Sequence, residues 1–142
     1  MFPIFGDGRY RMRPIHVDDL ARLAVEQGAE PGSRVIDAVG PESFAYRELV
    51  RTIGRLIGWR RLLVGVPPGI GYLGAAGLGR MMGDVMLTRD EVRGLMTDLL
   101  YVDSPATGET GLTDWISEHA DQLGRRYASE LARRKDRERA YS

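Results

Sequence analysis

Three arginines at alternate positions, Arg9, Arg11 and Arg13, are the residues of this sequence whose types and spacing most suggest ligand chemistry. Alternate side chains of an extended segment point to the same face, so the spacing predicts three neighbouring guanidinium groups. A guanidinium group binds phosphate or carboxylate in a bidentate manner. The arm could therefore capture an anionic substrate, or it could be a solvent-exposed loop. The sequence alone favours the loop.

A glycine-rich segment after the middle of the chain raises a second kind of site. Gly69, Gly71 and Gly74 match G-x-G-x-x-G, and Gly71, Gly74 and Gly77 match G-x-x-G-x-x-G. Both spacings occur where a backbone turn approaches a pyrophosphate at a helix N-terminus. Two prolines precede the first glycine, however, and no strand with a terminal acidic residue follows about 20 positions on. Close helix packing through small residues from Gly71 to Gly83 is the favoured interpretation.

The few other groups that could act as acids, bases or metal ligands are scattered. His16 and His119 are the only histidines, and cysteine is absent. His16 is followed by Asp18 and Asp19, but neighbouring residues at a junction between strand and helix point in different directions. We therefore predict a structural junction with Asp18 or Asp19 as the helix N-cap, and no metal site.

The overall composition indicates one globular domain. The 142 residues are 43% hydrophobic and 28% charged, with 20 basic and 20 acidic residues, so no global charge favours nucleic acid. The basic residues exceed the acidic ones only in the tail, over residues 125–142, where we predict a basic helix. Residues 62–79 carry no charge, but their glycines and prolines argue against a membrane span. The start of the sequence lacks the features of a secretion signal, and a cytoplasmic location is expected.

Hydrophobic periodicity and turn residues predict the order of the elements. The first 13 residues are expected to be a loop, and the β-branched run at 34–40 a buried strand. Thr88 and Glu91 have the spacing of a capping box, which predicts a helix from Arg89 through Leu100. The other expected elements are a helix ending at Gly28, an amphipathic helix at 46–57, a strand at 61–66, a helix beginning at the two prolines, a loop at 103–111, a capped helix at 112–124 and a final helix at 125–139.

The ordered series "RPIHVDDLA", "VIDAVGPESFAYRELVRTIG", "VPP", "GDVMLTRDEVRGLM" and "DWISEHADQLGRRYASEL" resembles the carboxy-terminal part of atypical extended short-chain dehydrogenase/reductases. The similarity is to the NAD(P)-binding epimerase/dehydratase-like group that includes the complex I Rossmann accessory subunit. It covers nearly the whole chain. "PIHVDDLA" followed by "GPE" and "YRELV" is its most specific part.

The resemblance implies a substrate-binding lobe, residues 1–142, that is not catalytically competent alone. In that family the nucleotide fingerprint and the catalytic Tyr-x-x-x-Lys pair precede the region matched here, and this sequence contains no such pair. The implied fold is α/β and helix-rich, with a few short strands and four to six helices but no full Rossmann sheet. NAD or NADP would bind to a separate Rossmann domain or partner chain. Related epimerases use an arginine of the arm on the substrate diphosphate, which points to Arg11 or Arg13.

Two other functions remain open from the residues. The first is a free-standing interaction or oligomerisation module that uses the apolar segment 62–79 and has no catalysis. The second is a small dinucleotide binder through Gly69–Gly77. Self-association is expected of the lobe and of the module, because either would expose apolar surface.

Overall fold

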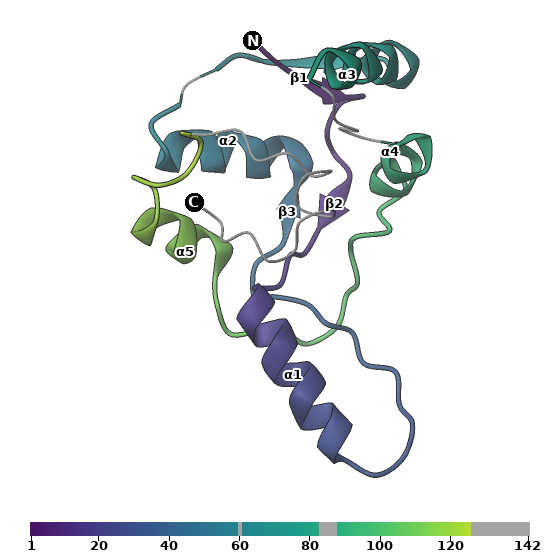
Figure 1. The fold of residues 1–142 in the computed structure, drawn as a ribbon, viewed down its shortest axis with the longest axis vertical. Helices are drawn as coiled ribbons and strands as arrows, with labels where there is room; N and C mark the ends of the chain where they lie inside the picture. The colour runs from purple at the N-terminus through teal and green to yellow at the C-terminus, as the bar shows by residue number, and fades with distance from the viewer. Residues whose placement is uncertain (60, 83–87, 126–142) are drawn as a thin grey trace.

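The structure, a computed structural model, describes residues 1–59, 61–82 and 88–125 (Figure 1). This part of the chain is an α/β fold with five helices and four short strands in two small sheets. The α/β, helix-rich expectation is thus confirmed. The elements in order are β1 Phe2–Phe5, β2 Arg11–Met12, α1 Val17–Ala29, β3 Phe44–Ala45, α2 Tyr46–Leu56, β4 Leu63–Val66, α3 Pro68–Met82, α4 Arg89–Met96 and α5 Leu112–Glu118.

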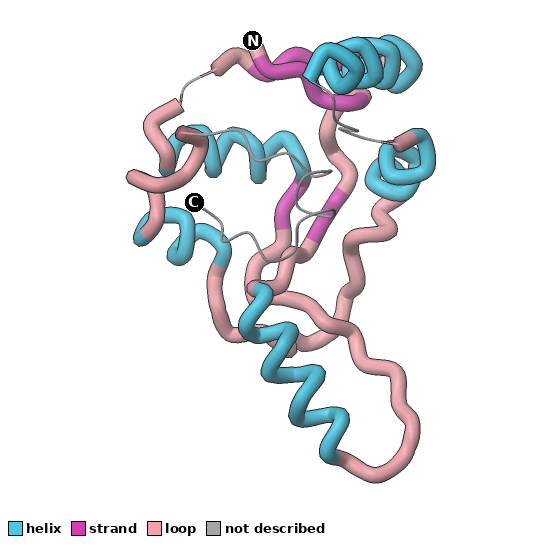
Figure 2. Tube along the Cα trace, viewed as in Figure 1, coloured by secondary structure: helices cyan, strands magenta, loops and turns pink. Residues whose placement is uncertain are grey.

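The two sheets join segments that are distant in the sequence (Figure 2). β1 pairs in parallel with β4, from Phe2 opposite Leu63 to Phe5 opposite Val66. β2 pairs with β3 in the antiparallel sense over two residues. The prediction of a loop over residues 1–13 was therefore wrong for β1 and β2. Each strand forms its hydrogen bonds with a strand far away in the sequence, β4 for β1 and β3 for β2, so the neighbouring residues do not predict it.

The helix α3 lies close against β1, and one glycine permits this approach. A Cβ atom on Gly71 would lie 2.6 Å from the ring of Phe5 and 3.0 Å from a methyl group of Val66. Gly74 and Gly77 have no neighbouring atom within 4 Å of such a Cβ. Helix packing is therefore the role of Gly71, whereas Gly83 of the predicted ridge lies outside the described residues.

The buried core is small, and its residues come from strands, helices and loops along the described chain. Ile4 is its most enclosed side chain, with 1% of its surface exposed. The helix α2 was predicted correctly, since one face packs inward through Leu49 and the chain turns at Gly58, where φ is +76°. The buried apolar residues of the described chain are Ile4, Tyr10, Val39, Phe44, Leu49, Val92 and Ile116.

The helix α1 and the segment after it extend away from the rest of the molecule (Figure 1). His16 caps α1, because its Nδ1 accepts the N–H of Asp18 at 3.3 Å. The predicted cap at Asp18 or Asp19 was wrong. Residues 34–40 form no strand, which corrects a second prediction, since no neighbouring strand of the described chain lies beside them.

The later helices are shorter than the sequence predicts. The capping box of Thr88 and Glu91 is formed as expected, but α4 ends at Met96, and Asp98 adopts a positive φ of 58°. The helix α5 ends at Glu118 instead of residue 124, and its N-cap, Gly111, offers no side chain. The predicted tail helix lies outside the described residues beyond Arg125. None of the described helices has the length and hydropathy required to cross a membrane.

Candidate functional site

The side chains of the three arginines of the arm contact three different parts of the chain. Arg9 is the most exposed, and its Nε lies 3.2 Å from the carboxylate of Asp7, two residues earlier. The arm is extended only at Arg11 and Met12. The three arginines are close in sequence, but each side chain contacts a different part of the chain, so they do not form one guanidinium cluster.

Arg11 is held at a corner formed by residues 98–101. Its backbone N–H donates to Asp98 at 2.6 Å, and its Nε donates to the same carboxylate at 3.1 Å. Its guanidinium carbon lies 3.8 Å from the centre of the Tyr101 ring. The backbone N–H of Arg11, and then its guanidinium group, lower the pKa of Asp98 below its ordinary value. The Arg11 side chain is still 51% exposed, so it can reach a ligand.

Arg13 has a structural role in this arrangement. Its Nε donates to the carbonyl of Gly40 at 2.8 Å, and its Nη1 donates to the carbonyl of Ser104. These two bonds join the end of the 34–40 segment to the loop at 103–111. An anion would have to replace both carbonyls in order to bind here.

The glycines at 69–77 lie within a helix instead of in a turn between a strand and a helix. Gly71, Gly74 and Gly77 lie inside α3, and Gly69 is in its first turn. Pro67 joins β4 to this helix and Pro68 is its first residue, and neither proline has an N–H to donate. The backbone donors that a pyrophosphate needs at such a turn are therefore reduced in number.

Asp19 connects α1 to the loop at 103–111, a role that the sequence did not reveal. Its buried carboxylate accepts the N–H groups of Glu109 and Thr110 at 2.9 and 2.8 Å, and the guanidinium of Arg22 at 3.0 Å. The Thr110 N–H, followed by Arg22, holds the pKa of Asp19 well below its usual range. Within the described ranges, no three acidic or histidine residues could hold a metal ion.

The backbone of the segment 34–40 is anchored at one end only, although the Arg34 side chain forms an exposed ion pair with Glu30. Thr107 and Gly108 donate backbone N–H groups to the carbonyl of Val39, and the Thr107 hydroxyl accepts the Val39 N–H. Val39 is buried, with 5% exposed, whereas Val35 is 99% exposed. Residues 33–36 make no backbone hydrogen bond within the described chain. A hollow of about 460 Å³ separates this free end from α1.

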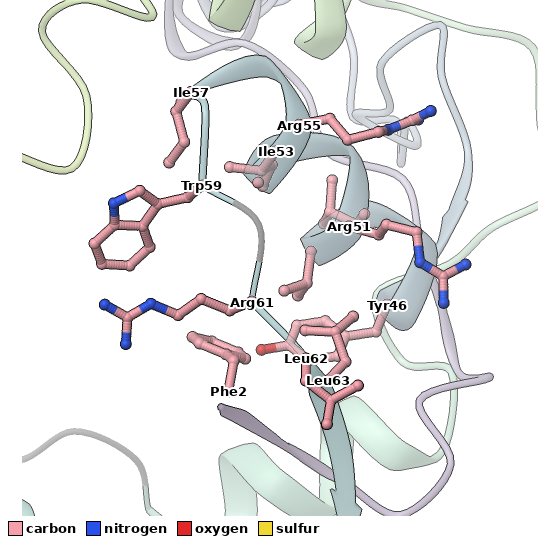
Figure 3. A pocket seen from close by; sticks show the side chains of 13 residues that line it. Phe2, Tyr46, Arg51, Ile53, Arg55, Ile57, Trp59, Arg61, Leu62 and Leu63 are labelled. Atoms are coloured by element: carbon pink, nitrogen blue, oxygen red, sulfur yellow. The ribbon is translucent and has the colours of Figure 1, made fainter.

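A larger apolar groove lies between α2 and the segment that leads into β4 (Figure 3). Its volume is about 670 Å³. Burial raises the pKa of Tyr46, which lines the groove. The groove is lined by Phe2, Tyr46, Leu49, Val50, Arg51, Ile53, Gly54, Arg55, Ile57, Trp59, Arg61, Leu62 and Leu63. The sequence indicated the apolar face of α2, but not that part of this face lies open beside Trp59.

Comparison with models of known protein families finds no match for this chain, and no curated protein matches it either.

Proposed function

We propose that this chain is the substrate-binding lobe of an atypical extended short-chain dehydrogenase/reductase. It acts together with a nucleotide-binding domain formed by protein outside these 142 residues. The observation that supports this proposal is the exposed, half-anchored segment at 34–40. The motif resemblance described above supplies the class of enzyme.

The segment has the composition of a buried strand but lacks the surroundings of one. Its β-branched residues suit a sheet interior, where a neighbouring strand satisfies their backbone groups. Here Val35 is 99% exposed, and residues 33–36 have no backbone partner in the described chain. Val17, Leu20 and Val25 of the nearby helix α1 are also exposed. Docking of a sheet edge onto this region would bury these side chains and pair the free backbone groups.

Within this function, Arg11 is the residue that binds substrate. The resemblance leaves Arg11 and Arg13 as alternatives, and the contacts of Arg13 with two backbone carbonyls favour Arg11. Beside Tyr101, its half-exposed guanidinium suits the diphosphate of a substrate. The lobe binds and orients the substrate, while NAD or NADP and the residues for hydride transfer belong to the nucleotide-binding domain.

An interaction module is the second candidate function, and α3 provides its support. Ile70, Leu73 and Leu78 of this helix are exposed, as is Leu62 before it. Isolated apolar side chains are normal on a protein surface, but a group of this kind favours a partner or a second copy. The third function, dinucleotide binding by Gly69–Gly77, has less support because Pro67 and Pro68 lack N–H groups.

Fluorescence titration with NADH and NADPH tests the proposal. We expect no saturable binding by the 142-residue chain. We expect binding when the chain is joined to, or mixed with, a nucleotide-binding domain encoded with it. Saturable binding by the chain alone would refute the proposal and restore the Gly69–Gly77 site.

Two matched substitutions distinguish the lobe from the interaction module. Val35→Asp and Leu73→Asp each place a carboxylate at an exposed apolar position, so both variants should fold. We expect Val35→Asp to abolish association with the nucleotide-binding domain in sedimentation experiments, and Leu73→Asp to preserve it. Self-association of the chain that is lost only in Leu73→Asp would support the module instead.

A further inference from the structure

The apolar groove beside α2 has the size and lining of a small-molecule site, and the proposed function does not use it. Its volume of about 670 Å³ lies within the range of about 300–1,000 Å³ found for ligand pockets. Leu49, Ile53 and Leu63 contribute to its hydrocarbon lining. The helix α5 contacts α2, but no residue of α5 lines the groove. The groove is therefore open on its own face of α2.

Two aromatic residues that line the groove, Phe2 and Trp59, are partly exposed instead of buried. Trp59 and Phe2 both line the groove, and Figure 3 draws the Arg61 side chain between their rings. Trp59 is half-exposed, and the guanidinium carbon of Arg61 lies 4.2 Å from the centre of its ring. This cation–π contact places a positive charge beside Trp59 in the groove lining. An apolar group that entered here would remove aromatic surface from water.

The charges around the groove all have the same sign. Arg51 and Arg55 lie along α2, with guanidinium groups that point away from Trp59, and Arg61 lies at the opposite side (Figure 3). No acidic residue is among those that line the groove. None of the three arginines forms an ion pair within the described part of the chain. The groove therefore attracts anions and disfavours cations.

One polar group of the lining is not cationic. The hydroxyl of Tyr46 points between Phe2 and Leu62 (Figure 3), and it makes no hydrogen bond within the described ranges. The remaining lining offers little to a ligand with many polar groups, because such groups would lose hydrogen bonds to water on entry. A ligand with an apolar body and a single charged head meets these conditions.

We propose that the groove binds one amphipathic carboxylate, a medium-chain fatty acid, with its hydrocarbon chain against α2 and its head beside Arg61, while Arg51 and Arg55 add to the positive field. The basic residues that follow Arg125 in the sequence make that segment a poor electrostatic match for the arginines. A membrane surface is a different occupant, because it would not saturate at one molecule per chain.

Isothermal titration calorimetry of the full 142-residue chain tests this site without any nucleotide-binding partner. The probes are decanoate, decyltrimethylammonium with the same chain and the opposite charge, and butyrate with the same head and little body, all below their micelle-forming concentrations. We expect decanoate to saturate at one molecule per chain and to quench or shift the fluorescence of Trp59. We expect each of the other two probes to bind at least about tenfold more weakly.

Substitution of the arginines tests the origin of the selectivity. Each contact of an exposed charge is worth little, so Arg61→Gln should weaken decanoate binding about two- to fivefold. The triple change Arg51→Gln, Arg55→Gln and Arg61→Gln should weaken it about tenfold or more. Arg89→Gln is the matched control, because Arg89 stacks on Tyr72 at 4.9 Å outside the groove. Circular dichroism checks that every variant folds.

Three results would overturn the proposal. The first is an absence of decanoate binding to the folded chain, as expected if protein fills the groove. The second is equal binding of decanoate and decyltrimethylammonium, or unchanged decanoate binding by the triple variant. The third is binding to decanoate-containing vesicles without saturation by free decanoate, which would indicate a membrane surface. Each result leaves the proposed function untouched, because that function requires the free end at Val35 and not this groove.

Discussion

Two valines four residues apart provide the sharpest test of the half-anchored segment. Val35 is 99% exposed and Val39 is 5% exposed, although both belong to one β-branched run. The loop around Thr107 binds the backbone at Val39 and does not reach Val35. Substitution of each valine by alanine therefore compares an anchored position with a free one in the same segment.

The expected difference follows from the burial of the two side chains. Val39→Ala removes two buried carbon groups at about 0.8 kcal/mol each, or about 1.6 kcal/mol. The cavity left behind raises the loss of unfolding free energy to about 2 kcal/mol. Val35→Ala removes groups that water already surrounds, so its effect should stay within about 0.5 kcal/mol.

Urea denaturation followed by circular dichroism measures this difference. With an m-value of about 2 kcal/mol/M, Val39→Ala should lower the midpoint by about 1 M, and Val35→Ala should leave it unchanged. Equal losses in the two variants, independent of protein concentration, would refute the reasoning, because Val35 would then be buried within a single chain. In the complex with a nucleotide-binding domain, Val35→Ala should instead weaken association about tenfold.

Two further substitutions test the contacts that hold the described chain together. The pKa of Asp19 is depressed, so its stabilising contribution is complete above the ordinary value of 3.8 and is lost as the pH falls below it. Asp19→Asn should remove this part of the acid sensitivity in urea titrations at pH 7 and pH 3, and an unchanged pH dependence would contradict the contact with Thr110. A Cβ atom on Gly40 would lie 2.1 Å from the carbonyl oxygen of Pro14, so Gly40→Ala should cost at least about 2 kcal/mol of unfolding free energy. The control Gly28→Ala has open space and a helical backbone, and should stabilise the chain by about 0.5–1 kcal/mol; equal effects of the two glycine changes would contradict the packing at Gly40.

Features that depend on neighbouring residues could be predicted from the sequence. The periodicity of α2, the turn at Gly58 and the capping box of Thr88 and Glu91 all arise within one or two helical turns. The strand β4 and the start of α3 at Pro68 were also predicted. In the helices and the turn, the side chain or backbone group that satisfies each residue lies close to it in the sequence, whereas β4 pairs with the distant β1 and was recognised by its apolar composition alone.

Features that depend on distant partners could not be predicted. The strand β1 requires β4, and the prediction at 34–40 was wrong because β propensity alone supplies no neighbouring strand. Asp19 has the local sequence of a helix cap, but its carboxylate binds backbone N–H groups ninety residues later. The alternation of arginines predicted an extended segment from Arg9 to Arg13, and of these three residues only Arg11 lies in a strand.

The sequence by itself determined the amphipathic helix α2, the capped start of α4, the absence of thiol chemistry and of a Tyr-x-x-x-Lys pair, and the presence of an arginine arm. Only the tertiary structure decided which arginine remains accessible, since Asp98 and Tyr101 position Arg11 while Gly40 and Ser104 occupy Arg13. The tertiary structure also forms the groove beside α2, because Phe2 and the segment that leads into β4 pack next to that helix. The physical reason is that residue type and spacing specify what a side chain can bind, whereas its partner and its exposure depend on segments that fold against it from elsewhere in the chain.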